Sequence, residues 1–409
     1  MMIKEKLGKY RSEVEKELKA NILPFWAYKA PDEKDGGFYG LVLNDLTTDL
    51  RAPKGSVLCS RILWTFSHAY ALSRDKLYLD RANRAYFYLR DNFLDNEYGG
   101  VYWSVDYKGN PIEVKKQIYA QAFAIYAFSE FYRATGFNES IGFAKDIFSL
   151  IEKFSFDRQY GGYYDAFNRD WTPTENMQLG SEDLNAPKSM NTSLHILEAY
   201  TNLLRCRDKR NQNNQELRNQ LKNLINTINK HIIDFSTYHF KLFFSENWES
   251  LSDTISYGHD IEGSWLLSEA AEVLNEKKLI EDTKETAIKL AEVTLREGIA
   301  PDGGLWYEGN KEGVTNFNSD WWPQAEAMVG FLNAYQISRK EYFLDASVKS
   351  WEFIKKYLID KEHGEWFWSV DKNRNVNKKL EKAGLWKCPY HNSRACMEVM
   401  ERLNHILNS

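Results

Sequence analysis

Segments with apolar residues at helical spacing alternate in pairs along the chain. In each internal pair the first segment, such as 115–135, is apolar on most sides, whereas the second, such as 277–297, keeps a charged face. A helix that is apolar all round is buried, and a helix with a charged face borders solvent. The pairs are 56–74 with 76–93, 115–135 with 138–154, 187–206 with 213–233, 257–275 with 277–297, 320–338 with 341–358, and the terminal segments 3–22 and 387–407. The pattern predicts about twelve helices in six pairs.

A turn that often holds two glycines, followed by an aromatic-rich run, recurs between these pairs. One copy is DNEYGGVYWSVDYKGNP from Asp95, another is DRQYGGYYDAFNRDWTP from Asp157, and a degenerate copy starts at Ser236. The equivalent positions lie 61 to 78 residues apart and are Gly36, Gly99, Gly161, His239, Gly303 and Gly364. Such a period indicates a repeated supersecondary unit, here a short β-hairpin plus two helices.

These repeats predict an all-α fold, an (α/α)6 barrel in which six outer helices surround six inner ones. The β-hairpins are expected in the loops at one mouth of the barrel. Because the ring closes through the two terminal segments, residues 1–409 are expected to form one domain with no linker. The fold class leaves the function open, which must be argued from a site.

Composition narrows the range of ligands. The net charge of -5 is spread along the chain, and no basic stripe suits a nucleic-acid backbone. Aromatic residues make up 15% of the 409 residues, with 13 Trp and 24 Tyr. Core packing explains most of these rings, and a cleft whose rings stack on pyranose sugars is the sharper interpretation for some of them.

The chain carries no targeting or membrane signal that we recognise. Its start is charged and amphipathic, without the apolar stretch or cleavage site of a signal peptide. No stretch approaches the roughly 20 apolar residues that span a bilayer. The cysteines, Cys59, Cys206, Cys388 and Cys396, form no CxxC pair and are typical of reduced thiols. We therefore expect a cytoplasmic monomer without membrane association.

Unusual residues fall in the first turns of the predicted inner helices, which converge at one mouth of the barrel. They are Arg61, Tyr119, Asn191, His195, His259, Glu262, Trp322, Glu326, Trp386, His391 and Arg394. Three of the eight histidines of the chain belong to this set, and three histidines at equivalent helix starts favour a functional site. The segment 168–186 lacks periodicity, as a lid or binding loop does. Asp183 near its end is a site residue, a helix cap or a solvated loop acid.

The roles of two of these groups stay open at this point. His259 and Glu262 are three residues apart and share a helix face, so they form half of a metal site or a histidine with an orienting carboxylate. No HExxH motif or cysteine cluster accompanies them, and we expect no metal. Arg61 either pairs with a core carboxylate or stabilises an oxyanion.

Three histidines, a glutamate and an arginine favour proton transfer over hydrolysis. Imidazoles that are neutral near pH 7 are suited to taking and returning a proton, and proton abstraction beside a carbonyl also needs a donor for the oxyanion. This set suits a sugar epimerase or an aldose–ketose isomerase. A glycosidase needs two separated carboxylates, for which Glu262, Glu326, Asp183 and Asp260 are available. No nucleotide-binding glycine motif is present.

The chain resembles the cellobiose 2-epimerases of the N-acylglucosamine 2-epimerase superfamily along essentially its whole length. The motifs that carry the resemblance, in order, are NEYGGVYWSVDYKGNP, LNAPKSMNTSLH, ISYGHDIEGSWLL, WWPQAEA and GLWKCPYHNSRAC. Ser193 stands where the family commonly has a second histidine, whereas His195 is kept.

The resemblance implies a role for each matched residue. His259 and His391 are implied as the acid/base pair at C2, and Glu262 as the carboxylate that supports His259 and ring opening. The groups implied to hold the O1 and O2 region and the enediolate are His195 and Arg61. Implied contacts to the substrate are Tyr119, Asn191, Trp386 as a stacking platform, and Trp322 and Asp183 at the cleft border, to which we add Glu326.

The resemblance also implies the substrate class. The family acts on β-1,4-linked disaccharides such as cellobiose and lactose, through a cis-enediolate, and no metal, NAD or ATP is implied. The alternatives are an N-acylglucosamine 2-epimerase or a mannose isomerase of the same superfamily. From other classes they are an (α/α)6 glycoside hydrolase or a sugar-binding module without catalysis.

Overall fold

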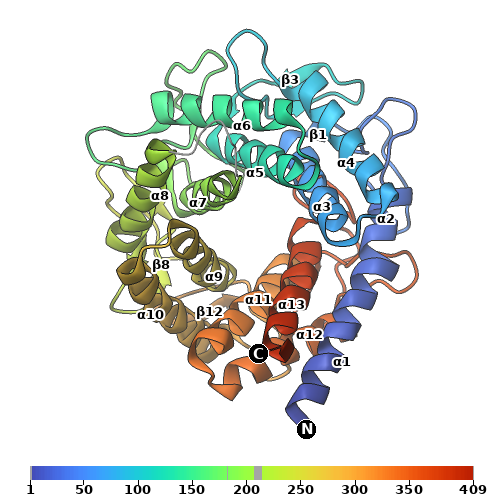
Figure 1. Ribbon diagram of the computed structural model, residues 1–409, viewed down its shortest axis with the longest axis vertical. Coiled ribbons are helices and arrows are strands. Elements are labelled where there is room, and N and C mark those ends of the chain that lie inside the picture. The colour runs from blue at the N-terminus through green and yellow to red at the C-terminus, as the bar shows by residue number, and fades with distance from the viewer. Residues whose placement is uncertain (1, 182, 207–213, 409) are drawn as a thin grey trace.

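The computed structural model describes residues 2–181, 183–206 and 214–408, whose helices form two concentric rings (Figure 1). The inner ring consists of α3 (Ser56–Ser73), α5 (Ile118–Thr135), α7 (Met190–Arg205), α9 (Tyr257–Leu274), α11 (Trp321–Ser338) and α13 (Tyr390–Asn408). The outer ring consists of α1 (Met2–Glu17), α4 (Lys76–Tyr88), α6 (Asn138–Leu150), α8 (Gln215–Thr227), α10 (Lys277–Val293) and α12 (Glu341–Tyr357). Each inner helix packs against the next, and α13 packs against α3. The predicted (α/α)6 barrel is confirmed.

Several outer helices end in a π-helical turn. These turns follow α1, α4, α6, α8 and α10 at Leu18–Ile22, Leu89–Phe93, Ile151–Ser155, Ile228–Ile232 and Thr294–Gly298. The first terminal helix runs past its predicted end: the π-helical turn continues directly into α2 (Leu23–Tyr28), which has Pro24 in its first turn. The predicted helix 213–233 begins at Gln215, and residue 213 lies outside the described residues.

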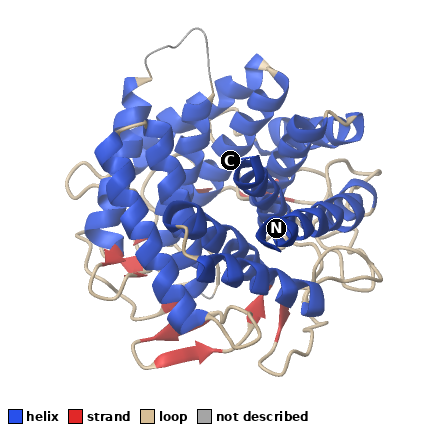
Figure 2. Ribbon diagram, turned by 60° about the horizontal axis from the view of Figure 1, so that its bottom comes forward, coloured by secondary structure: helices blue, strands red, loops and turns tan. Residues whose placement is uncertain are grey.

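Short antiparallel strands gather at one end of the barrel, where the inner helices begin (Figure 2). They are β1 (Lys54–Gly55), β2 (Ser104–Val105), β3 (Pro111–Glu113), β4 (Lys116–Gln117), β5 (Ala166–Phe167), β6 (Lys188–Ser189), β7 (Ile233–Asp234), β8 (His239–Phe240), β9 (Phe243–Phe244), β10 (Ile255–Ser256), β11 (Glu308–Asn310), β12 (Gly313–Asn316), β13 (Ser319–Asp320) and β14 (Ser369–Val370). Strands β1, β4, β6, β10 and β13 run directly into inner helices. They therefore fix the first turns of α3, α5, α7, α9 and α11.

The repeated glycine turns have the predicted hairpin form. The two sides of a turn are joined by an antiparallel bridge, as between Leu94 and Val101 and between Phe156 and Tyr163. Gly162 has a φ of +76°, and a Cβ there would lie 2.3 Å from the Trp248 ring. Glycine at this position thus provides both the left-handed backbone and the space for the ring.

A buried lysine ties four of these turns to the chain that leads toward the next inner helix. The Nζ–Oδ2 pairs are Lys54–Asp32 at 2.7 Å, Lys116–Asp95 at 2.8 Å, Lys188–Asp157 at 2.6 Å and Lys382–Asp360 at 2.6 Å. The second carboxylate oxygen caps the turn, as when Asp95 Oδ1 accepts from the backbone N–H of Glu97. The turns and the inner helices at the mouth are thereby fixed to each other.

Removing one member of such a pair is expected to destabilise the fold strongly. Both Lys116 and Asp95 have fully buried side chains, so Asp95→Ala leaves a buried ammonium without its partner. We expect the free energy of unfolding, measured by urea denaturation, to fall by about 3–5 kcal/mol. The matched control is Glu97→Gln, because Glu97 is exposed and also pairs with Arg169, the second partner of Asp95; here we expect a loss below about 1 kcal/mol. Equal losses would contradict the anchoring role.

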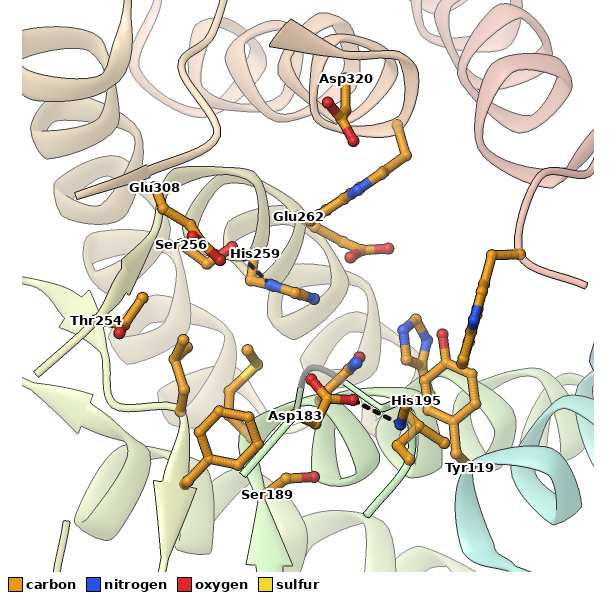
Figure 3. Close-up of a pocket in the computed structure, with 18 of the residues that line it drawn as sticks. Tyr119, Asp183, Ser189, His195, Thr254, Ser256, His259, Glu262, Glu308 and Asp320 are labelled. Atoms are coloured by element: carbon orange, nitrogen blue, oxygen red, sulfur yellow. Dashed lines mark hydrogen bonds between the residues drawn. The ribbon is translucent and has the colours of Figure 1, made fainter. Parts of the chain in front are cut away.

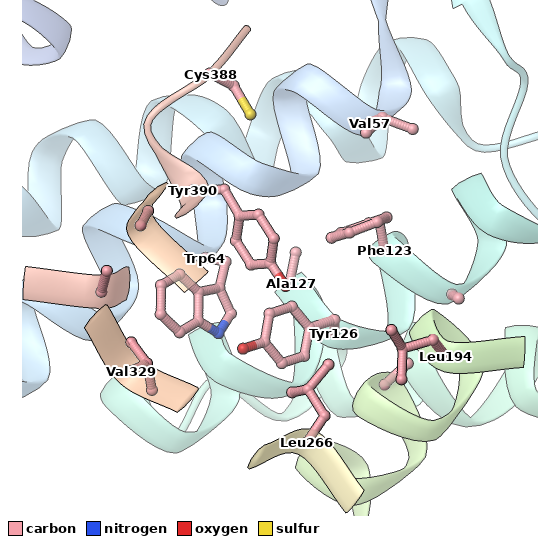
Figure 4. Close-up of a cluster of buried hydrophobic side chains, with 14 of the residues drawn as sticks. Val57, Trp64, Phe123, Tyr126, Ala127, Leu194, Leu266, Val329, Cys388 and Tyr390 are labelled. Atoms are coloured by element: carbon pink, nitrogen blue, oxygen red, sulfur yellow. The ribbon is translucent and has the colours of Figure 1, made fainter. Parts of the chain in front are cut away.

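The interior of the barrel below the mouth is filled by side chains of the inner helices (Figure 4). Trp64 stacks on Tyr126 with ring centroids 5.3 Å apart, and the ring of Tyr390 meets Trp64 edge-on. This aromatic layer forms the floor of the space above it. Among the described residues, none of the helices combines the length and apolarity needed to cross a membrane.

Candidate active site

A cavity of about 650 Å³ opens at the mouth, between the first turns of the inner helices. This volume suits a small-molecule ligand. Every residue predicted for the site lines the cavity except Glu326 and Arg394, which lie behind it. Figure 3 shows Tyr119, His195, His259 and Glu262 around this space. The strands that enter the inner helices bring these residues together from segments far apart in the sequence.

His259 lies at the start of α9, where its Nδ1 and the Ser256 Oγ are 2.7 Å apart (Figure 3). Its ring lies 4.7 Å from that of Trp322. Burial, together with a smaller effect of the charge of His195, lowers the pKa of His259 to about 3 against the opposing effect of Glu326. His259 is therefore a neutral imidazole at pH 7, which is the form that accepts a proton.

His391 lies at the start of α13, with Nδ1 2.7 Å from Glu326 Oε1. Glu326 also accepts from Arg394 at 2.6 Å and from the Trp265 indole at 3.0 Å. A carboxylate among such donors favours the tautomer in which His391 Nδ1 carries the proton, so that Nε2 is the free base. Burial and the charge of Arg61 lower the pKa of His391 well below its usual value.

His195 on α7 has the same type of support. Its Nδ1 lies 3.0 Å from Glu198 Oε2, and its ring packs between Tyr119 and Phe123. Burial lowers the pKa of His195, while Glu198 opposes that shift. All three predicted histidines thus meet at the cavity in neutral form.

Glu262 differs from the sequence-based expectation that it supports His259. Its Oε1 accepts from Arg394 at 2.7 Å and lies 3.9 Å from His391 Nδ1. The Nδ1 of His259 is instead hydrogen-bonded to the Ser256 hydroxyl. The shared helix face was predicted correctly, but the buried Arg394 draws the carboxylate inward. Burial and the charge of Glu326 together raise the pKa of Glu262 to about 8, against the opposing effect of Arg394. Its Oε2 has no hydrogen-bond partner among the described residues.

Within the described part of the chain, Arg61 lacks the core carboxylate partner that was one of the two alternatives left open by the sequence. It is buried with 3% exposure, and no ion pair joins it to a carboxylate of the described residues. Nη2 donates to the Tyr119 hydroxyl at 2.8 Å, Nη1 contacts the Cys388 thiol at 3.7 Å, and the guanidinium lies 4.2 Å from the Phe123 ring centroid. A buried cation with neutral partners that faces a cavity is ready to stabilise an anion formed there.

Sequence reasoning missed the groups that lie behind the histidines. Glu198, Tyr390 and Arg394 are buried and hydrogen-bonded to one another. Glu198 follows His195 by three residues, as Glu262 follows His259, and this spacing was the available signal. Arg394 was noted at the helix start, but its role was not assigned.

The outer part of the cavity is acidic and aromatic. Asp183 in the irregular loop lines it together with Glu308, Asp320 and the Tyr307 and Trp386 rings. Asp183 Oδ2 accepts from the backbone N–H of Gly180 at 2.8 Å, which stabilises the loop itself. Burial raises the pKa of Asp320 to about 7. Glu308 and Asp320 were not predicted, because each follows an exposed-looking loop without periodicity.

One set of side chains in the site approaches metal-binding geometry. Glu262, Glu326 and His391 each offer a ligand atom, all within 4.8 Å of one another. The Arg394 guanidinium donates to both carboxylates, so a cation of the protein already lies among these oxygens. A metal ion bound by these three ligands would lie beside the guanidinium or displace it.

We expect full activity after exhaustive chelation and dialysis. Because Arg394 supplies the positive charge between the two glutamates, a divalent ion would have to displace it. The measurement is the rate of the sugar epimerisation that the motifs predict, before and after treatment, with metal content determined in parallel. Loss of activity that Zn²⁺ or Mn²⁺ restores would show that the three ligands hold a functional metal.

A comparison with protein-family models shows to which family this chain belongs. Residues 36–395 match the family described as N-acylglucosamine 2-epimerase (GlcNAc 2-epimerase). The chain belongs to this family.

Within the N-acylglucosamine 2-epimerase family, the chain is similar to the cellobiose 2-epimerases, as its motifs predicted. It is 46% identical over 392 residues to that of Bacteroides fragilis, covering 95% of this chain and 98% of that one. It is 42% identical over 394 residues to that of Dictyoglomus turgidum, covering 96% and 98%. The solved structure of the Bacillus thermoamylovorans B4167 enzyme has a TM-score of 0.90 at 41% identity, covering 97% and 100%.

The alternatives within the family are more distant. A D-mannose isomerase of Marinomonas mediterranea is 23% identical, covering 94% of this chain and 97% of that one. The N-acylglucosamine 2-epimerase of Bos taurus is also 23% identical, covering 99% and 93%.

Proposed function

We propose that this protein is a cellobiose 2-epimerase, which reversibly inverts C2 of the reducing-end glucose of β-1,4-linked disaccharides. It converts cellobiose to glucosyl-mannose and lactose to epilactose. The observation that carries the proposal is the buried Arg61, a cation without a carboxylate partner among the described residues, which faces a cavity lined by three neutral histidines. The similar proteins of Bacteroides fragilis and Dictyoglomus turgidum are named cellobiose 2-epimerases, which supports cellobiose as the substrate.

The first step opens the hemiacetal ring, which needs an acid and a base. Glu262 is protonated at pH 7 and has a carboxyl oxygen without a partner at the cavity wall. It donates a proton to the ring oxygen as the C1–O5 bond breaks. His195, oriented by Glu198, accepts the proton of the O1 hydroxyl, and the aldehyde forms.

The second step moves the proton at C2. His259 or His391 takes this proton, the C–H electrons form the C1=C2 bond, and the aldehyde oxygen becomes an enediolate oxyanion. Arg61 stabilises the oxyanion, together with the Tyr119 hydroxyl, whose pKa burial raises so that it stays protonated. The other histidine, protonated from solvent, then delivers its proton to C2 from the opposite face, as the C1=C2 electrons form the new C–H bond and the oxyanion electrons re-form the carbonyl. The first histidine returns its proton to solvent, so that both imidazoles are neutral again.

Hydrolysis fits this arrangement less well. Glycosidases hold two carboxyl groups on either side of the scissile bond, about 5–9.5 Å apart. Glu262 and Glu326 instead share one guanidinium and lie side by side, with Glu326 behind the cavity wall. They cannot flank a glycosidic bond.

Incubation with cellobiose in D2O tests the proposal. We expect glucosyl-mannose that carries deuterium at C2 by NMR, because the proton passes through a histidine that exchanges with solvent. Release of glucose would identify a hydrolase, and unchanged cellobiose with measurable binding would identify a binding protein. Activity only on mannose, or on N-acetylglucosamine with ATP, would favour the other branches of the family.

The alkaline side of the pH profile should report Glu262. Because its folded pKa is raised to about 8, it loses the donating proton as the pH rises through that value, and kcat/KM should fall there. Glu262→Gln should lower the rate and remove this limb, since an amide does not titrate. If kcat/KM of Glu262→Gln still falls near pH 8, the titrating group is another residue.

A further inference from the structure

Arg394 joins four of the six inner helices below the cavity. It lies on α13 with 1% exposure. Its Nη1 donates to Glu198 on α7 and contacts the Tyr390 hydroxyl. Its Nη2 donates to Glu262 on α9 at 2.7 Å and to Glu326 on α11 at 2.6 Å. One guanidinium therefore serves three carboxylates from three different helices.

Each of these carboxylates touches a group at the cavity wall or forms part of it. Glu198 Oε2 lies 3.0 Å from His195 Nδ1, and Glu326 Oε1 lies 2.7 Å from His391 Nδ1. Glu262 lines the cavity itself, whereas Arg394 does not. Arg394 thus acts on the reacting groups only through other residues.

An arginine suits this position better than a lysine or a metal ion. Its planar fork offers two N–H-bearing ends in fixed geometry, so one end holds Glu198 while the other bridges Glu262 and Glu326. Its charge is permanent at any working pH. A lysine has one flexible nitrogen and cannot bridge both sides at once.

We propose that Arg394 is the positioning residue of this site: its fork holds Glu198, Glu262 and Glu326 so that His195 and His391 keep their ring orientation and tautomer. This inference rests on the proposed epimerase function. Glu262 is protonated at pH 7 even beside this fork, and without it the buried Glu198 and Glu326 would also take up protons more readily. Protonated glutamates would no longer accept from the histidine Nδ1–H groups, and the histidines would lose the tautomer that makes Nε2 a base.

The cluster is surrounded by groups whose charge bears on this effect. The titratable and charged side chains that face it are Arg61 on α3, Tyr119 and Tyr126 on α5, His195 on α7, His259 on α9 and His391 on α13. Arg61 is the other permanent cation among them, and it donates to Tyr119 rather than to a carboxylate. Arg394 is therefore the cation in direct contact with the three glutamates.

The test is Arg394→Lys with cellobiose as substrate. We expect kcat to fall by about 100-fold, as when a general base loses its orientation, while KM stays within about threefold because substrate contacts remain. The acidic limb of the pH–rate profile should move to higher pH, because the glutamates have a higher pKa when the guanidinium is absent. Loss of structure alone would lower activity without moving this limb.

The matched control is Arg402→Lys on the same helix. Arg402 is also held by carboxylates, Glu269 and Glu398, and also packs on Trp265, but it lies at the opposite end of the barrel. We expect an unchanged pH profile and kcat within about twofold. A similar profile shift in both variants would overturn the specific role of Arg394.

If Arg394→Lys does not fold, a second variant tests the same inference. Glu198→Gln keeps the side-chain volume and removes the anion between Arg394 and His195. It should lower kcat and move the acidic limb to lower pH, opposite to Arg394→Lys, because Glu198 raises the pKa of both His195 and Glu262. Wild-type rates in either folded variant, or an unshifted limb, would overturn the inference. A wild-type enzyme that leaves C2 of cellobiose and lactose unchanged would instead refute the proposed function.

Discussion

Replacing His391 or His259 by alanine is expected to lower kcat for epimerisation by about 10²–10⁴-fold, the usual contribution of a general acid–base group. Both rings lie at the cavity wall on different inner helices, α13 and α9, and both contact Trp322. Their neutral form at pH 7 permits proton abstraction in either direction. The measurement is the initial rate on cellobiose, with circular dichroism to confirm folding.

Deuterium exchange makes the histidine variants more informative than rates alone. In D2O, a variant that keeps one base should still exchange the C2 proton of one epimer without forming the other. NMR would show this as loss of one C2–H signal. His405→Ala on the same helix α13 is the control, since His405 is exposed at the far end of the barrel. Activity within about tenfold of wild type in His259→Ala or His391→Ala would contradict the two-base mechanism.

The barrel and the position of the site were predictable because the sequence repeats. Apolar periodicity separated inner from outer helices, and the glycine turns placed the starts of the inner helices at one mouth. That end also brought Arg61, His195, His259 and His391 together. Helix ends were less predictable, as α2 shows, because the chain stays helical through Pro24, where a break is usually expected.

Partners inside the site were harder to predict because they depend on distances across the barrel. Glu262 was expected to support His259, its neighbour on the same face, and instead binds Arg394 from α13. Asp320 and Glu308 come from loops whose sequence carries no periodic signal. Pairings between residues more than a hundred positions apart, such as Glu198 with Arg394, leave no trace in local spacing.

Arg61→Met is expected to separate activity from stability. The variant removes the cation that faces the developing enediolate, so kcat/KM should fall by about 10²–10³-fold, as when an oxyanion donor is lost. Arg61 has no carboxylate partner among the described residues, so its burial is not compensated by an ion pair. A methionine of similar length restores apolar packing against Phe123 and Tyr390, which the guanidinium now covers. We therefore expect the Tm to stay unchanged or to rise.

Arg402, a partly buried arginine that is paired with carboxylates, provides the comparison. Arg402→Met leaves Glu398 without this ion pair and Glu269 with Arg205 alone at the other end of the barrel, so it should lower the Tm, with kcat/KM on cellobiose nearly unchanged. If Arg61→Met loses kcat/KM but not Tm, and Arg402→Met loses Tm but not kcat/KM, then Arg61 serves catalysis and Arg402 serves stability. If Arg61→Met instead loses stability as Arg402→Met does, or keeps kcat/KM within about threefold of wild type, the oxyanion role is wrong. The stabilising charge would then have to come from His195 and the Tyr119 hydroxyl, the remaining donors beside the guanidinium.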